Sequence, residues 1–286
     1  MITQTLGSVT FSLRRPHDFS WLLALGDPFA VFDQNDSGNV SFGLTAPDGA
    51  RLFVKTAGAR PAEYDGDPAD AIARLRAART VYETLSHPAL IRYREAMERP
   101  GDLALVFDWA DGECLHDHWN FEVRPKLTDP TSPYRRFRAL PVAEKLAAAA
   151  VLFDFLCAAE RAGYTAVDFY DSSLLYDFDA HRLTLCDIDL FRPAPAVNDL
   201  GPDWPCSPRL AAPEDRQPGA LIDNRTDVYH LGRLLLILLA GEDHPDRAHW
   251  EASPARWGLV QRAVSPSRED RFPSLAAFWE EWEKSP

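Results

Sequence analysis

Three charged residues, Lys55, Asp168 and Asp187, have the types and the order along the chain that phosphoryl transfer requires. This reaction needs a cation on the phosphates, a carboxylate that holds Mg²⁺ and a carboxylate near the attacking hydroxyl. Lys55 ends the apolar segment 52–55, Asp168 lies between a predicted helix and a predicted hairpin, and Asp187 lies where that hairpin ends. The pattern predicts an enzyme that binds a nucleoside triphosphate and a divalent metal.

The elements that must position these residues differ between the two parts of the chain. Residues 1–110 contain strand-like segments and one helical pattern, whereas residues 111–286 are dominated by helical patterns. We therefore expect an α+β fold of two lobes, a small antiparallel β-sheet lobe with one helix and a larger, mainly helical lobe. Strands are predicted at 28–33, 39–45, 51–55, 92–98 and 103–109, a hairpin at 174–176 and 183–186, and helices at about 68–85, 141–161, 227–241, 257–264 and 274–282.

From about residue 28 to residue 275 the chain resembles the protein-kinase superfamily, as a divergent serine/threonine-kinase-like domain of the bacterial type. The segment 166–173 is similar to the catalytic-loop motif H-R-D-L-x-x-x-N, and residues 212–214 repeat the A-P-E signature unchanged. Segment 227–232 is similar to the buried central helix of the family, residues 86–88 are similar to its H-P turn, and Arg271 stands where an arginine pairs with the A-P-E glutamate, here Glu214.

The resemblance implies an ATP- and Mg²⁺-dependent (or Mn²⁺-dependent) phosphotransferase, most similar to serine/threonine protein kinases, whose acceptor is an unknown protein or small molecule. The alternative is a catalytically silent kinase-like module, a pseudokinase that binds a nucleotide or a protein; a nucleotidyl transferase is a further variant. The implied catalytic residues are Asp168 and Lys55, the nucleotide contacts are Lys55, Gly38, Val40, Asp108 and Ala110, and the metal ligands are Asp187, Ser173 and Asp189.

Several positions depart from the family pattern and favour the silent alternative. The phosphate loop, residues 33–40, keeps only the third glycine, Gly38. Phe53 replaces the alanine that packs on adenine, and Phe107 occupies the position at the back of the same pocket. Ala78 replaces the glutamate that pairs with the strand lysine, and Ser173 is a weaker oxygen ligand than the usual asparagine.

Acidic residues leave further alternatives open. Asp33 and Asp36 of the phosphate loop would repel a triphosphate unless they point away from it or bind metal. Glu63 or Glu83 could replace the missing partner of the strand lysine, or both could be surface residues. Asp171 or Asp189 could supply the charge that Ser173 lacks, although Asp189 could equally cap the following turn.

Two connecting segments bear on regulation and substrate. Segment 187–214 has no Thr or Tyr, Ser207 is its only hydroxyl residue, and Val167 replaces the arginine that would receive a phosphate. We therefore expect no switching by phosphorylation there. Segment 116–140 either binds an anionic part of the substrate or is a surface connection packed by its aromatic residues; its basic residues are Arg124, Lys126, Arg135, Arg136 and Arg138.

Composition excludes several other classes. The net charge of −13 repels polyanions, so we expect no nucleic-acid partner. The four cysteines are widely separated and form no C-x-x-C pair, which predicts neither a zinc knuckle nor a disulfide framework. No signal-peptide pattern and no apolar run near ~20 residues occurs, so a cytoplasmic protein without a membrane partner is expected.

Overall fold

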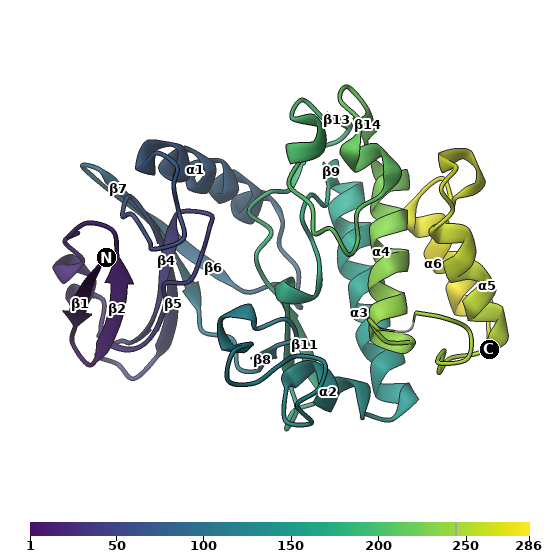
Figure 1. Cartoon of the computed structure of the whole chain (residues 1–286), viewed down its shortest axis with the longest axis horizontal. Helices are drawn as coiled ribbons and strands as arrows, with labels where there is room; N and C mark the ends of the chain where they lie inside the picture. The colour runs from purple at the N-terminus through teal and green to yellow at the C-terminus, as the bar shows by residue number, and fades with distance from the viewer. Residues whose placement is uncertain (244) are drawn as a thin grey trace. The chain divides into compact units, whose positions relative to one another are not determined.

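The computed structural model describes residues 1–243 and 245–286 and has an α+β architecture, with 35% helix, 22% strand and several small antiparallel sheets (Figure 1). The chain divides into two compact units. The small unit comprises Met1–Ser86 and Ile91–Ala110, and the large unit comprises His87–Leu90 and Asp111–Pro286. Throughout the described residues, every helix is too short or too polar to cross a bilayer.

The small unit is built on five antiparallel strands in the order β3-β4-β5-β7-β6. Side chains alternate between the two faces, so Val40, Phe42 and Leu44 of β4 share one face and are completely buried. They pack against the separate β1–β2 hairpin, where the ring of Phe42 lies edge-on to that of Phe11 at 5.5 Å. The strands are β1 (Ile2–Leu6), β2 (Val9–Leu13), β3 (Asp27–Phe32), β4 (Asn39–Thr45), β5 (Arg51–Ala57), β6 (Tyr93–Arg99) and β7 (Asp102–Asp108).

Helix α1 (Pro68–Thr84) contacts strands β5, β6 and β7. It begins where the Asp67 side chain accepts a hydrogen bond from the Ala69 N–H, with proline at the first helical position. Leu75, Ala78 and Tyr82 are buried at three- and four-residue spacing, and the Tyr82 ring lies 4.8 Å from the Phe107 ring of β7. The apolar stripe of this helix therefore holds it to the sheet.

In the large unit the long helices α3 and α4 lie side by side (Figure 1). Helix α4 begins with a reciprocal capping box between Asp223 and Thr226 and is buried along most of its length. Helix α6 contacts α3, with the rings of Phe153 and Phe278 4.9 Å apart. The helices are α2 (Pro133–Arg138), α3 (Val142–Arg161), α4 (Asn224–Leu239), α5 (Pro254–Ala263) and α6 (Leu275–Lys284).

Short antiparallel sheets carry the connections of the large unit. One has the order β8-β10-β11, and the others are the pairs β9–β12 and β13–β14. These strands are β8 (Glu113–Cys114), β9 (Tyr164–Thr165), β10 (Leu174–Asp177), β11 (Arg182–Leu185), β12 (Arg192–Pro193), β13 (Ala196–Val197) and β14 (Leu221–Ile222). The predicted hairpin 174–186 is confirmed as β10–β11.

Candidate catalytic site

Asp168 lies in a loop that the buried helix α4 holds in place. The Oδ1 atom of Asp227 accepts hydrogen bonds from the Thr165 hydroxyl at 2.9 Å and from the Ala166 N–H at 3.0 Å. Burial raises the pKa of Asp227 to about 7, although the charge of His230 and these two hydrogen bonds act in the opposite direction. Asp227 thus fixes the backbone two residues before Asp168.

Asp187 follows strand β11 in a segment tied to the Asp168 loop. The N–H of Cys186 donates to the Ser173 carbonyl oxygen at 2.9 Å. Further along, β12 pairs with β9, and the rings of Phe169 and Phe191 lie 5.8 Å apart. These contacts attach the two segments to each other on both sides of the aspartates.

Tyr170 lies within electrostatic range of both carboxylates. Burial raises the pKa of the Tyr170 phenol well above its usual value, and the charges of Asp168 and Asp187 raise it further, although a hydrogen bond to Ser172 acts in the opposite direction. Asp168 and Asp187 also share a left-handed backbone, with φ values of 57° and 54°. This region is unfavourable for residues with a Cβ atom and is concentrated at functional sites. Two aspartates with this uncommon backbone conformation therefore lie within electrostatic range of the same tyrosine.

Oxygen atoms suited to a hard cation occur beside Asp187. Asp187 is exposed, Ile188 is buried, and Asp189, the next residue, is half-buried. The Ser173 hydroxyl is buried and has no hydrogen-bond partner among the described residues. Carboxylate and hydroxyl oxygens are ligands that Mg²⁺ accepts, so the donor types of these residues match such an ion.

Asp171 does not supply a free charge to that set. Its Oδ2 atom lies 2.6 Å from Lys126 Nζ, and its Oδ1 atom lies 2.5 Å from an Arg209 nitrogen. Burial by itself would raise the pKa of Asp171, but hydrogen bonding to His116 and the charges of Lys126 and Arg209 outweigh it and hold the pKa far below the usual range. The suggestion that Asp171 compensates for Ser173 is therefore wrong, because two cations already neutralise it.

The basic connection 116–140 is largely neutralised within the large unit. Arg124 pairs with Asp117 at 2.5 Å and with Glu113, which also pairs with Arg136. Arg138 pairs with Glu251 and donates to the Leu238 and Ala240 carbonyls, and Lys126 pairs with Asp171 as described. These four cations do not form an open anion-binding surface. The structure favours a surface connection that is packed onto the unit.

The main sheet of the small unit determines which side chains share a face with Lys55. Lys55 pairs across the strands with Ser41 of β4, whereas Val40 pairs with Thr56, the next residue of β5. Neighbouring residues of a strand point to opposite faces, so Val40 lies on the face opposite Lys55 and packs in the core. The prediction that Val40 contacts the same ligand as Lys55 is corrected, and Ser41 is the β4 residue on that face.

The retained glycine of the phosphate loop has a packing role. Gly38 has φ +83°, and a Cβ atom there would lie 2.8 Å from the Tyr64 ring and 2.9 Å from the Ala71 side chain. The Asp33 carboxylate accepts a hydrogen bond from the Ser12 N–H at 2.7 Å. Packing within the unit thus explains why glycine stands at 38, and Asp33 binds the β1–β2 hairpin.

Two further predicted nucleotide contacts lie at the end of the small unit. The Asp108 carboxylate binds the guanidinium groups of Arg92 and Arg94, and its N–H donates to the Arg92 carbonyl oxygen at 2.9 Å. A nucleotide contact by Asp108 would therefore have to use its carbonyl oxygen. Ala110 is half-buried and is the last residue of this unit.

The position of the missing glutamate is occupied by packing. Ala78 on α1 is completely buried, and Glu83 pairs with Arg79 one turn away at 2.7 Å. Glu63 is exposed. Neither observation identifies Glu63 or Glu83 as a partner of Lys55.

The predicted pair between the A-P-E glutamate and Arg271 is confirmed. Arg271 is 1% exposed and binds both oxygens of Glu214, at 2.6 and 3.0 Å. Arg268 and Thr226 also contact Glu214. Residues 57 apart in the sequence are thus joined by a bidentate ion pair.

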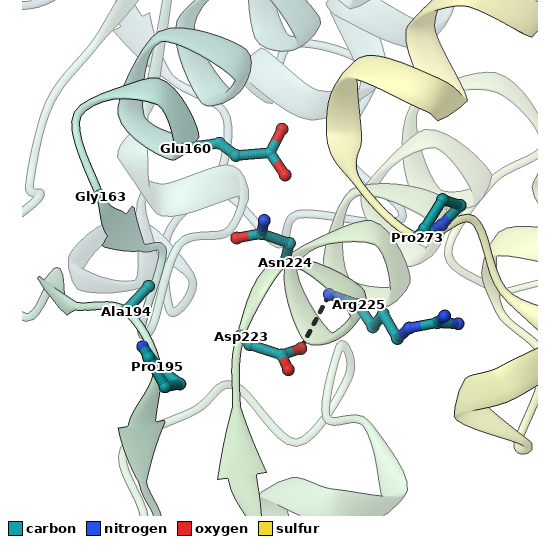
Figure 2. Close-up of a pocket in the computed structure, with 8 residues that line it drawn as sticks. All are labelled: Glu160, Gly163, Ala194, Pro195, Asp223, Asn224, Arg225 and Pro273. Carbon is teal, nitrogen blue, oxygen red and sulfur yellow. Dashed lines mark hydrogen bonds between the residues drawn. The ribbon is translucent and has the colours of Figure 1, made fainter.

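The large unit contains a cavity of about 410 Å³ (Figure 2). It is lined by the end of α3, the start of α4 and prolines, and none of the predicted site residues lines it. Figure 2 shows the Asp223 side chain, which accepts the Arg225 N–H at 3.0 Å, at one side of this cavity.

No protein-family model matches the chain, and no curated protein matches it.

Proposed function

We propose that the chain is an ATP- and Mg²⁺-dependent phosphotransferase with a protein-kinase-like fold, similar to serine/threonine protein kinases. The observation that carries the proposal is the pair Asp168 and Asp187, two non-glycine residues with left-handed backbones on adjoining loops. Each such backbone costs about 1–2 kcal/mol, so the surrounding contacts must compensate for both. In the described residues only one other non-glycine has this conformation, His181 in the turn of the β10–β11 hairpin.

Each residue has a defined role in this proposal. Asp168 orients the acceptor hydroxyl and accepts its proton. General-base catalysis of this kind typically increases the rate about 10²–10⁴-fold. Asp187 and Ser173 hold the metal ion, with Asp189 as a further oxygen ligand. Lys55 steadies the phosphates. Bound Mg²⁺ neutralises the charge that develops on the transferred phosphoryl group.

Two interactions around the proposed site support the same function. Asp227 binds the backbone before Asp168, and the bidentate Glu214–Arg271 pair anchors the A-P-E segment beside α4. Both interactions involve residues that the resemblance singled out. They support the proposal because a catalytic carboxylate needs a rigid loop to hold its geometry.

Nucleotide-induced stabilisation tests the proposal. ATP with Mg²⁺ at ~100 times its Kd stabilises the protein by about 2.7 kcal/mol, which is measured as a rise in Tm. We expect Asp187→Ala to lose the metal-dependent part of this rise. Asp168→Asn keeps the rise and loses turnover, and the exposed Asp179→Ala serves as the matched control. γ-Labelled and α-labelled ATP then show whether a phosphoryl or a nucleotidyl group is transferred.

A second candidate function is a silent binding module, and one observation favours it. Phe32 and Phe53 lie on the Lys55 face of the sheet with ring centroids 6.2 Å apart, and Phe107 lies 6.1 Å from Phe53. These rings stand where the family resemblance requires space for adenine. Absence of any nucleotide-dependent Tm rise in the wild type, together with its appearance in Phe53→Ala, would support this candidate and overturn the phosphotransferase.

A further inference from the structure

A cysteine, an aspartate and a histidine that have no role in the proposed phosphotransferase converge in the large unit. Cys206 lies before the 3₁₀ turn Pro213–Arg216, Asp215 lies within that turn, and His230 lies on α4. The Cys206 Sγ atom is 3.7 Å from His230 Nε2 and 3.7 Å from Asp215 Oδ2. Asp215 Oδ2 and His230 Nε2 are 2.7 Å apart. Three ligand atoms of different chemistry thus surround one point.

This arrangement does not fit a nucleophilic triad. A triad requires the histidine to face the thiol with one ring nitrogen and the aspartate with the other. Here Nε2 of His230 contacts both Cys206 and Asp215. A proton therefore cannot pass through the ring from the thiol to the carboxylate, and a shared cation explains the convergence better.

The two distances from sulfur agree with a zinc-type ion. Tetrahedral bonds of about 2.3 Å to sulfur and about 2.1 Å to nitrogen or oxygen place sulfur about 3.6 Å from each other ligand. Both sulfur distances observed are 3.7 Å. The nitrogen–oxygen separation must open from 2.7 Å to about 3.4 Å, a movement that breaks one hydrogen bond and replaces it with two metal bonds.

A second observation points to a missing ligand. Asp215 is completely buried, and its Oδ1 atom has no hydrogen-bond partner in the described part of the chain. An unsatisfied buried carboxylate oxygen is costly, so this carboxylate lacks a partner that the described residues do not supply. Its Oδ2 atom also accepts the Ala212 N–H at 2.7 Å, which fixes the orientation of the carboxylate.

A second cluster of potential metal ligands in the same unit differs in its charged partners. His116, Asp171 and Glu242 also bring potential ligand atoms together, but Lys126 and Arg209 pair with the two carboxylates and occupy the place of a cation. Among the described residues, the only ion-pair partner of Asp215 is His230. The Cys206 cluster therefore has a histidine, itself a possible metal ligand, where the other cluster has Lys and Arg side chains.

We propose that Cys206, Asp215 and His230 bind one zinc-class divalent cation through sulfur, oxygen and nitrogen, with the fourth position held by water. Three protein ligands with water in the fourth position are typical of catalytic zinc sites. Cys206 is half-buried, whereas Asp215 and His230 are buried. The ion would attach the segment before α4 to α4 itself, and this proposal stands whether or not the chain transfers phosphate.

Cobalt substitution tests the site on the full-length protein. Titration of metal-free protein with Co²⁺ alone should give one equivalent bound and a near-ultraviolet thiolate-to-cobalt charge-transfer band. Cys206→Ala should lose that band, whereas Cys157→Ala, a buried cysteine on α3, should keep it. Zn²⁺ at ~100 times its Kd should raise the Tm of the wild type by about 5 °C or more, and this rise should vanish in Cys206→Ala.

Cys206→Ala is suitable because its sulfur makes only contacts of 3.6–3.7 Å, so the variant should fold, as circular dichroism would verify. Asp187→Ala should keep the cobalt band, which separates this site from the proposed Mg²⁺ site. Any of three results would overturn the proposal: no cobalt binding by the wild type, a band that persists in Cys206→Ala, or a band that is lost in Cys157→Ala.

Discussion

Replacement of Asp227 by asparagine should change how stability depends on pH. Asp227 is 2% exposed, and its Oδ1 atom accepts the Thr165 hydroxyl and the Ala166 N–H. Asparagine keeps an oxygen in that position, so both hydrogen bonds can remain. It removes the ionisable group, so the part of the pH dependence that belongs to this carboxyl should disappear.

The sign follows from the raised pKa. The unfolded carboxyl ionises near 3.8, whereas burial holds the folded carboxyl protonated up to a pKa of about 7. Between these values the folded state binds more protons, so its contribution to the free energy of unfolding is present below pH ~4 and is lost as pH rises through ~7. One proton over this interval corresponds to about 4 kcal/mol, at about 1.4 kcal/mol per pH unit.

Chemical denaturation of the wild type and of Asp227→Asn from pH 4 to pH 8 provides the assay. The difference in unfolding free energy should shift by about 4 kcal/mol in favour of the variant across that range. A pH-independent loss of unfolding free energy is also expected in the variant, because the new amide NH₂ group needs a hydrogen-bond partner inside the protein. Parallel curves for the two proteins would refute the reasoning, since they would mean that Asp227 ionises in the folded state as it does in the unfolded chain.

Two further predictions concern packing and charge. Gly38→Ala should destabilise the small unit by about 2–4 kcal/mol, because a left-handed backbone and close contact with the Tyr64 ring both oppose a Cβ atom. The control Gly49→Ala, where φ is +85° and the space is open, should cost only about 1–2 kcal/mol. Equal losses of stability in urea unfolding would contradict the role of the Tyr64 contact. Arg271→Ala should cost about 3–5 kcal/mol in the same measurement because it leaves the buried Glu214 carboxylate with weaker partners, and a loss below about 1 kcal/mol would show that the pair is not needed.

Local sequence patterns were sufficient for most elements. The strand predicted at 39–45 coincides with β4, and the helix predicted at about 68–85 coincides with α1 within one residue, because apolar spacing and an Asp-Pro start are local signals. The β1–β2 hairpin was missed, although residues 2–6 and 9–13 alternate around Gly7. Helix α2 was missed too, although Ser132 and Pro133 mark its start.

For the candidate site, the sequence predicted the residue types and the tertiary structure decided their surroundings. Asp168 and Asp187 were proposed from short contiguous motifs, and the pairing of Glu214 with Arg271, 57 residues apart, was expected only from the family resemblance. The neutralisation of Asp171 could not be predicted, because Lys126 lies 45 residues away and Arg209 lies 38 residues away.

By itself, then, the sequence determined where strands and helices form and which carboxylates are candidates, because propensity, periodicity and short motifs act within a few residues. Only the tertiary structure decided that Val40 points away from the Lys55 face and that Cys206 meets His230. A strand reverses its side chains at every residue, so a shift of one position exchanges core and ligand face. Likewise, a buried charge or thiol takes its chemistry from whichever distant side chain the fold places beside it.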